Sequence, residues 1–209
     1  MIGIKVKSGY DYSKEALVME IDLAQALGKR ESVEASLYYL YMMADGEVTY
    51  SEEKIFDTIC KELDIDYDTK EKIIKKCKEF AGKNSDMLNV IMSEKKDEQS
   101  GQNWFGERDL SKDARIIWNL VNLGYADNVY SEEERKISKY LVDKWSVNLE
   151  VYQEFIDIAD TMLALVKQRE WVLSTFTKGR ERDKKEKKIE SEMEQLLSDV
   201  NLTIEELTM

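Results

Sequence analysis

Apolar side chains recur every three or four positions along most of the chain, which is the period of an α-helix with one buried face. The chain contains no proline, so helices can run without forced breaks. The pattern therefore predicts an all-α protein, a bundle of about seven to nine helices with a C-terminal helical extension. The predicted helices cover about residues 13–27, 32–44, 50–63, 68–81, 86–96, 113–126, 131–144, 148–171 and 186–207.

The same pattern divides the 209 residues into three parts. Residues 1–12 are predicted to be a flexible N-terminal arm, 13–178 an all-helical domain, and 179–209 a charged linker followed by an amphipathic helix. The basic run from Lys178 to Lys188 alternates with acids, which favours a solvated helical face over a nucleic-acid or membrane patch. The last helix carries one narrow apolar stripe: Ile189, Met193, Leu196, Leu197 and Val200. Such a stripe needs a packing surface, so the helix either folds back on the domain or docks on a partner or a second copy.

An internal repeat relates residues of about 32–65 to residues of about 114–147 without a gap. Each half consists of an apolar helix, an acidic turn and an amphipathic helix, which predicts two pseudo-symmetric halves. The turns read "ADGEVTYSEE" from Ala44 and "ADNVYSEEE" from Ala126. The matching pairs are Asp45 with Asp127, Gly46 with Asn128, Thr49 with Ser131, and Glu52 with Glu134.

Local physics accounts for most of the repeated turn. Gly46 and Asn128 are of the residue types that most readily take a left-handed conformation, which suits a helix-ending position. Thr49 and Ser131 are natural N-caps with a glutamate three residues on, so each half predicts a capping box.

The aspartates of the turn need a separate explanation. Asp45 and Asp127 follow the C-terminal ends of helices, where the helix dipole disfavours a carboxylate. One explanation is a hydrogen bond from the carboxylate to amides of the turn. The other is a cation bound by the acids and by free carbonyls at the helix end. Both interpretations remain open from the sequence.

The two turns, each followed by an amphipathic helix, resemble the TerB-like family of tellurite-resistance and stress proteins. The resemblance covers about residues 15–170. It implies an all-helical domain of two similar halves with no established catalytic activity and an acidic surface that binds a divalent metal. The residues it assigns to that site are Asp45, Glu47, Glu52, Asp127 and Glu134. The second turn departs from the pattern, because Val129 stands where the first has Glu47, so the implied site is asymmetric.

Composition narrows the chemistry further. The chain has no histidine, which removes the usual general base and the common zinc ligand. A metal site would therefore be all-oxygen and would favour Ca²⁺ or Mg²⁺. The stretch from Asp64 to Lys75 imitates a calcium loop, but Thr69 replaces its glycine and Lys75 its final glutamate, so we interpret it as a helix cap with a charged first turn. Cys60 and Cys77 fall on apolar helical faces and are expected to be buried, reduced thiols.

Charge and segment patterns set the expected location and partners. The net charge of −12 argues against nucleic acid as a main partner. No signal peptide or membrane span is evident, so a cytoplasmic protein is expected. Two functions follow as hypotheses. The first is a non-enzymatic TerB-like module that binds a divalent cation or acts in a tellurite or chemical-stress response. The alternative is a protein-interaction or assembly module whose acidic turns are only helix caps.

Overall fold

The structure is a computed structural model, and it describes residues 30–44, 46, 48–81 and 109–207. Helices make up 83% of these residues and no strand occurs among them, so the predicted all-α class is confirmed. The helices are α2 (Arg30–Met42), α3 (Tyr50–Glu62), α4 (Tyr67–Ala81), α6 (Leu110–Gly124), α7 (Glu132–Trp145), α8 (Leu149–Thr175) and α9 (Arg180–Glu206). The predicted N-terminal arm of residues 1–12 and the predicted helices at 13–27 and 86–96 lie outside the described residues.

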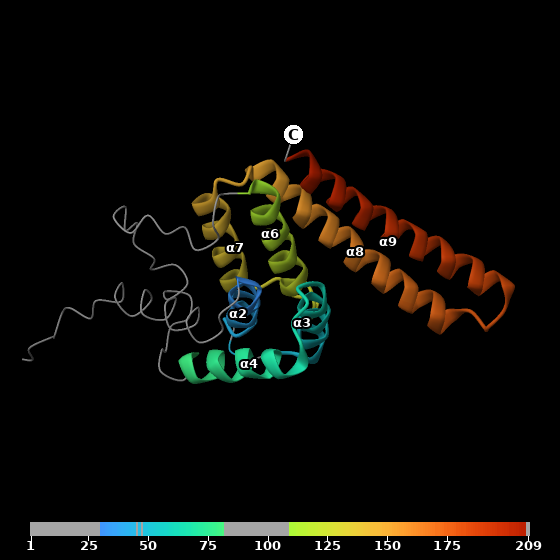
Figure 1. Ribbon diagram of the computed structural model, residues 1–209. Coiled ribbons are helices and arrows are strands. Elements are labelled where there is room, and N and C mark those ends of the chain that lie inside the picture. Colours follow the sequence, from blue (N-terminus) through green and yellow to red (C-terminus); the bar gives the residue numbers. More distant parts are fainter. Residues whose placement is uncertain (1–29, 45, 47, 82–108, 208–209) are drawn as a thin grey trace, which may run out of the picture.

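Helices α2 and α6 occupy the middle of the bundle, and α3, α4 and α7 surround them (Figure 1). The sequence of α2 is apolar on most sides, and accordingly Tyr38, Tyr39 and Tyr41 are all buried. Helix α6 contacts α2, α3, α7, α8 and α9. Its Trp118 packs edge-on against Phe155 of α8, with ring centroids 5.6 Å apart. Each large apolar side chain buried in this way stabilises the fold by about 1.5–3 kcal/mol, so α6 holds the bundle and α8 together.

Helices α8 and α9 form an antiparallel hairpin that projects from the bundle as an arm (Figure 1). Each helix has 27 residues, so the arm is about 40 Å long. Apolar positions alternate every three and four residues along both helices, which is the seam of a coiled coil. Arg169 of α8 joins the two helices through ion pairs with two residues of α9, Glu186 at 2.9 Å and Glu190 at 3.3 Å.

The C-terminal segment therefore folds back on the domain, which was one of the two predicted alternatives. Val200 and Ile204 join the main core, and Ile189 joins a smaller cluster within the arm. Leu197 was wrongly placed in the stripe, because it is 42% exposed and Ile204 takes its place on the buried face. The charged stretch after Gly179 is helical from Arg180 onward, so it is a solvated helical face, which the alternation of its charges favours, and not a linker.

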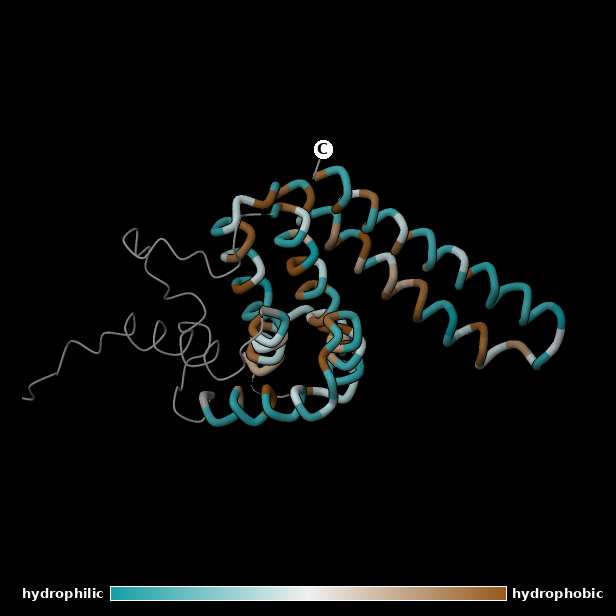
Figure 2. The backbone as a smooth tube through the Cα atoms, in the orientation of Figure 1, coloured by the Kyte–Doolittle hydropathy of each residue, from teal (hydrophilic) through white to brown (hydrophobic). Residues whose placement is uncertain are grey.

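Hydropathy follows this packing (Figure 2). Helix α9 is hydrophilic along most of its length, while α8 alternates between hydrophilic and hydrophobic positions. Of the helices in the described part of the chain, none combines the length and the hydropathy needed to cross a bilayer.

Candidate functional site

The first acidic turn leads into a complete capping box at the start of α3. The backbone amide of Thr49 donates to Glu52 Oε2 at 2.6 Å, and the Thr49 hydroxyl donates to the same oxygen at 2.8 Å. In return, the amide of Glu52 donates to Thr49 Oγ1 at 3.3 Å. Glu52 is only 3% exposed. Its carboxylate therefore satisfies the amide and the hydroxyl of its own N-cap.

The second turn repeats this arrangement at the start of α7. The Ser131 amide donates to Glu134 Oε2 at 2.8 Å, and the Glu134 amide donates to Ser131 Oγ at 3.2 Å. Glu134 is also 3% exposed. Both predicted capping boxes are confirmed.

The turns themselves use left-handed residues, as the sequence predicts. Gly46 has φ of 98° and Asn128 has φ of 72°. In the second turn Asp127 Oδ1 accepts a hydrogen bond from the Val129 amide at 2.9 Å. This bond is the first of the two explanations given above for the aspartate. Asp45 and Glu47 lie outside the described residues, so the comparison stops at the second turn.

Three members of the predicted metal site are therefore described, and each has a local bond: Glu52, Asp127 and Glu134. Across residues 30–44, 46, 48–81 and 109–207, no group of three or more His, Cys, Asp or Glu side chains is arranged to hold a metal ion. The local similarity of the two turns is clear, whereas the pseudo-symmetry of the whole halves stays a prediction.

A buried tyrosine cluster lies behind the second turn, and the sequence reasoning missed it. Tyr130, which precedes the N-cap Ser131, shares a hydrogen bond of 3.2 Å with the hydroxyl of Tyr152. Tyr41 from α2 lies 3.4 Å from Ser138 Oγ. Burial raises the pKa of Tyr41 and of Tyr130 well above the usual value. These tyrosines are therefore neutral at ordinary pH, and they anchor the turn to the bundle.

The two cysteines and the stretch from Asp64 to Lys75 also have structural roles. Cys60 and Cys77 are buried and free, as predicted, and burial raises the pKa of each thiol to about 12. A thiol with so high a pKa is a poor nucleophile at neutral pH. In the stretch that imitates a calcium loop, Asp66 accepts from the Thr69 amide at 2.8 Å, which confirms that Asp66 is a helix cap.

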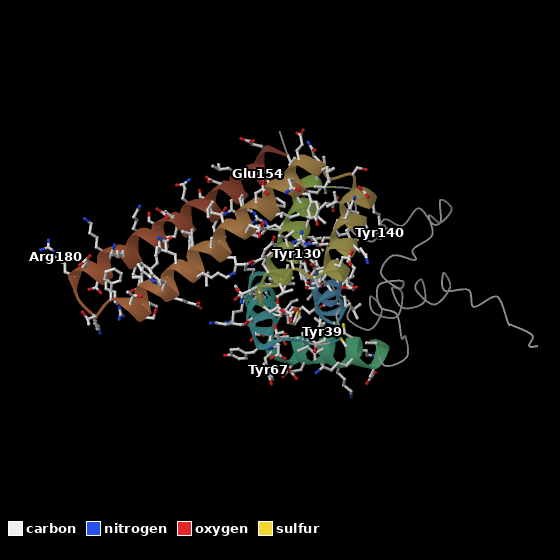
Figure 3. All side chains as sticks on the ribbon, turned by 180° about the vertical axis from the view of Figure 1, so that it is seen from behind. Tyr39, Tyr67, Tyr130, Tyr140, Glu154 and Arg180 are labelled. Carbon is white, nitrogen blue, oxygen red and sulfur yellow. The ribbon has the colours of Figure 1, made fainter. Side chains whose placement is uncertain are left out.

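The arm carries a surface that the sequence reasoning did not identify. A groove of about 460 Å³ opens at its base, where α8 and α9 leave the bundle. Three carboxylates of α8 and one of α9 surround the groove, and Gln153, Thr161 and the edge of the buried Ile158 complete its lining. Those carboxylates are Glu150, Glu154, Asp157 and Asp199. Figure 3 shows Glu154 at this end of the arm and Arg180 at the opposite end.

The free end of the arm carries aromatic and basic side chains, whereas the base carries carboxylates. Trp171 is 56% exposed, and its indole packs edge-on against Phe176 with ring centroids 5.7 Å apart. Lys185 Nζ lies 5.0 Å from the centroid of the Phe176 ring. An aromatic pair with a lysine over it is thus presented to solvent. The switch of the chain from acidic to basic residues in this region was the sequence signal that could have revealed it.

We define the outer face of the arm as the side of the hairpin on which the groove opens. Residues fourteen apart in a coiled-coil helix lie on the same side, so Trp171 shares the side of Asp157. By the same spacing Lys185 shares the side of Asp199. On α8, Tyr152, Ile156 and Ala159 belong to the bundle core and lie on the other side. The outer face comprises Glu150, Glu154, Asp157 and Trp171 of α8 and Lys185, Lys188, Asp199 and Leu202 of α9.

Comparison with known proteins identifies no family model, no curated protein and no solved structure that matches this chain.

Proposed function

We propose that this chain is a non-enzymatic protein-interaction module, and that the outer face of the α8–α9 arm is its docking surface. The observation that carries the proposal is the exposed Trp171 at the end of a projecting hairpin. Tryptophan is one of the residue types that contribute most of the binding energy in protein interfaces.

The bonds within the acidic turns also favour the interaction module over the module that binds a divalent cation. The carboxylates of Glu52 and Glu134 already accept from the N-cap amides at 2.6 and 2.8 Å, and Glu52 also accepts from the Thr49 hydroxyl. A cap role accounts for these bonds and for the burial of both glutamates without a cation. The TerB-like resemblance, with its divalent cation and its stress response, stays a prediction that no described contact favours.

Photo-crosslinking in cells that express the full chain tests the proposal. A photoreactive phenylalanine analogue would replace Trp171 or, on the same helix, Gln168. Matched controls would carry it at Tyr50 and Tyr67, which are exposed aromatic positions on the bundle. The proposal expects discrete crosslinked species from the arm positions, with the partner peptide identified by mass spectrometry. Equal or weaker crosslinking from the arm than from the bundle would refute it.

A further inference from the structure

The charge of the arm reverses along its length. From Lys167 to Lys188, around the free end, nine basic and four acidic side chains give a net charge of +5. At the base, residues 149–161 and 195–207 together hold seven acidic and no basic side chains. The free end is therefore complementary to the base of the same arm, although the two lie too far apart to meet within one molecule: the fourteen residues from Asp157 to Trp171 span about 21 Å of helix.

The outer face adds an apolar match to this charge match. At the free end Trp171 is exposed and packs against Phe176, and Lys185 lies over the Phe176 ring. At the base the carboxylates surround a groove that Ile158 borders with only 8% of its surface exposed, and Leu202 of α9 is 54% exposed. The groove is broad and open to solvent, so the indole ring of a neighbouring molecule can lie against it without being enclosed.

We infer that the partner of the outer face is a second copy of this chain, paired antiparallel so that Trp171 of each arm enters the acidic groove of the other. The inference rests on the proposed function, because it names the partner of the same surface. In the pair, Lys185 and Lys188 of one copy face Asp157 and Asp199 of its partner, and the reverse contact forms at the other end.

Two-fold symmetry makes the pairing self-consistent. An isologous interface requires each patch to meet its complement on an identical subunit, which the reversal of charge along one arm provides. The axis would pass near Ala164, which lies seven residues from both Asp157 and Trp171. A small side chain at that crossing lets the two α8 helices approach closely. Two hairpins side by side would then form a four-helix arrangement.

Other kinds of partner match fewer features of the outer face than a second copy does. An anionic membrane would engage the basic end but would repel the acidic base. An unrelated acidic protein would likewise leave the groove unfilled. A second copy is the one partner for which both ends find complements, and the complement of each end is present in this chain.

Charge exchange between two variants tests the pairing in the purified full chain. The free-end variant is Lys185→Glu with Lys188→Glu, and the base variant is Asp157→Lys with Asp199→Lys. Light scattering at low salt is expected to give wild type twice the monomer mass of 24.4 kDa. Each variant alone is expected to be monomeric, whereas an equal mixture of the two should recover the dimer mass, because reversed ends meet reversed bases. High salt should weaken the wild-type dimer at least tenfold.

Two controls separate this pattern from general charge effects or misfolding. Arg180→Glu with Lys187→Glu makes the same change in net charge on a side of α9 away from the outer face and should leave the dimer intact. Circular dichroism should show unchanged helicity in every variant, and Trp171→Ala should weaken the dimer at least tenfold. A monomeric wild type, or a mixture that stays monomeric, would overturn the inference.

Two results would distinguish a failure of the inferred dimer from a failure of the proposed interaction module. If wild type is monomeric but Trp171 crosslinks to another protein, the interaction module stands and the second copy is wrong. If wild type is monomeric and instead co-sediments with vesicles of anionic phospholipid, the occupant is a membrane surface and the inference is wrong.

Discussion

The capping glutamates offer the most direct test of what the acidic turns do. In the structure the carboxylate of Glu134 accepts from the partly buried Ser131 amide at 2.8 Å, and the carboxylate of Glu52 accepts from both the amide and the hydroxyl of Thr49. Replacing either glutamate by alanine removes a charged acceptor, and hydrogen bonds to charged groups contribute about 1.5–3 kcal/mol.

We therefore expect Glu134→Ala to lower the free energy of unfolding by about 2 kcal/mol. Glu52→Ala should cost about 2–3 kcal/mol, because its carboxylate accepts from both the amide and the hydroxyl of Thr49. For a chain of this length, 1 kcal/mol corresponds to about 2–4 °C in the melting temperature. Calorimetry or chemical denaturation followed by circular dichroism would measure both variants.

Glutamine substitutions at the same two positions distinguish a glutamate that caps a helix from one that binds a metal ion. A glutamine oxygen also accepts from the N-cap amide, so Glu134→Gln and Glu52→Gln should cost well under half as much as the alanine variants. A metal site would respond differently, because loss of the charge would remove cation-dependent stability in both kinds of variant. Exposed Glu133 in the same first turn provides the control, and Glu133→Ala should change stability by about 0.3–1 kcal/mol at most.

The cap interpretation would be refuted by a specific pattern of melting temperatures. If Ca²⁺ or Mg²⁺ raised the melting temperature of wild type, and both the alanine and the glutamine variants lost that increase, the carboxylates would be ligands. The interpretation expects that neither ion nor a chelator shifts the wild-type transition, and that the alanine variants alone are substantially destabilised.

Two further predictions concern the tyrosine cluster. Gly124→Ala would place a Cβ 2.6 Å from Tyr130 Cδ2 and 2.9 Å from the Tyr41 hydroxyl, so it should destabilise the fold by about 1–3 kcal/mol in denaturant titration; Gly179→Ala, with no atom within 4 Å, should be neutral. Because the pKa of Tyr41 and of Tyr130 is raised in the fold, their contribution to stability is complete below about pH 10 and is lost as the pH rises above it, by about 1.4 kcal/mol per pH unit for each tyrosine. Denaturant titrations from about pH 9 to 11 would measure this loss, and unchanged stability across that range would contradict it.

The features predicted well from the sequence are those decided within a few residues. Each capping box joins residues three apart, and the left-handed turns depend on the residue types of Gly46 and Asn128 alone. The helices of the bundle follow equally from apolar periodicity. The alternation is strong enough to predict α8 from its cap at Asn148 through Trp171, four residues short of its observed end at Thr175.

Features that depend on distant contacts were predicted poorly. The tyrosine cluster joins Tyr41 to residues about ninety positions away, and nothing in the local sequence indicates which helices meet there. In α9, Leu197 and Ile204 are both apolar, and only the direction of α8 decides that Ile204 is buried and Leu197 exposed. Periodicity gives the side of a helix that is apolar, but a neighbouring helix selects which part of that side is covered.

The recurrence of an acidic turn need not indicate a ligand. A helix that ends in a left-handed residue and is followed closely by another helix needs an N-cap, a reciprocal glutamate and an acceptor for the turn amides. In the second turn Ser131, Glu134 and Asp127 meet these three needs with bonds of 2.8–3.2 Å. Two copies of one helix–turn–helix unit would therefore keep the same acids for folding alone. By contrast, Trp171 stays 56% exposed even though its indole packs against Phe176, which is why the arm rather than the turns carries the functional proposal.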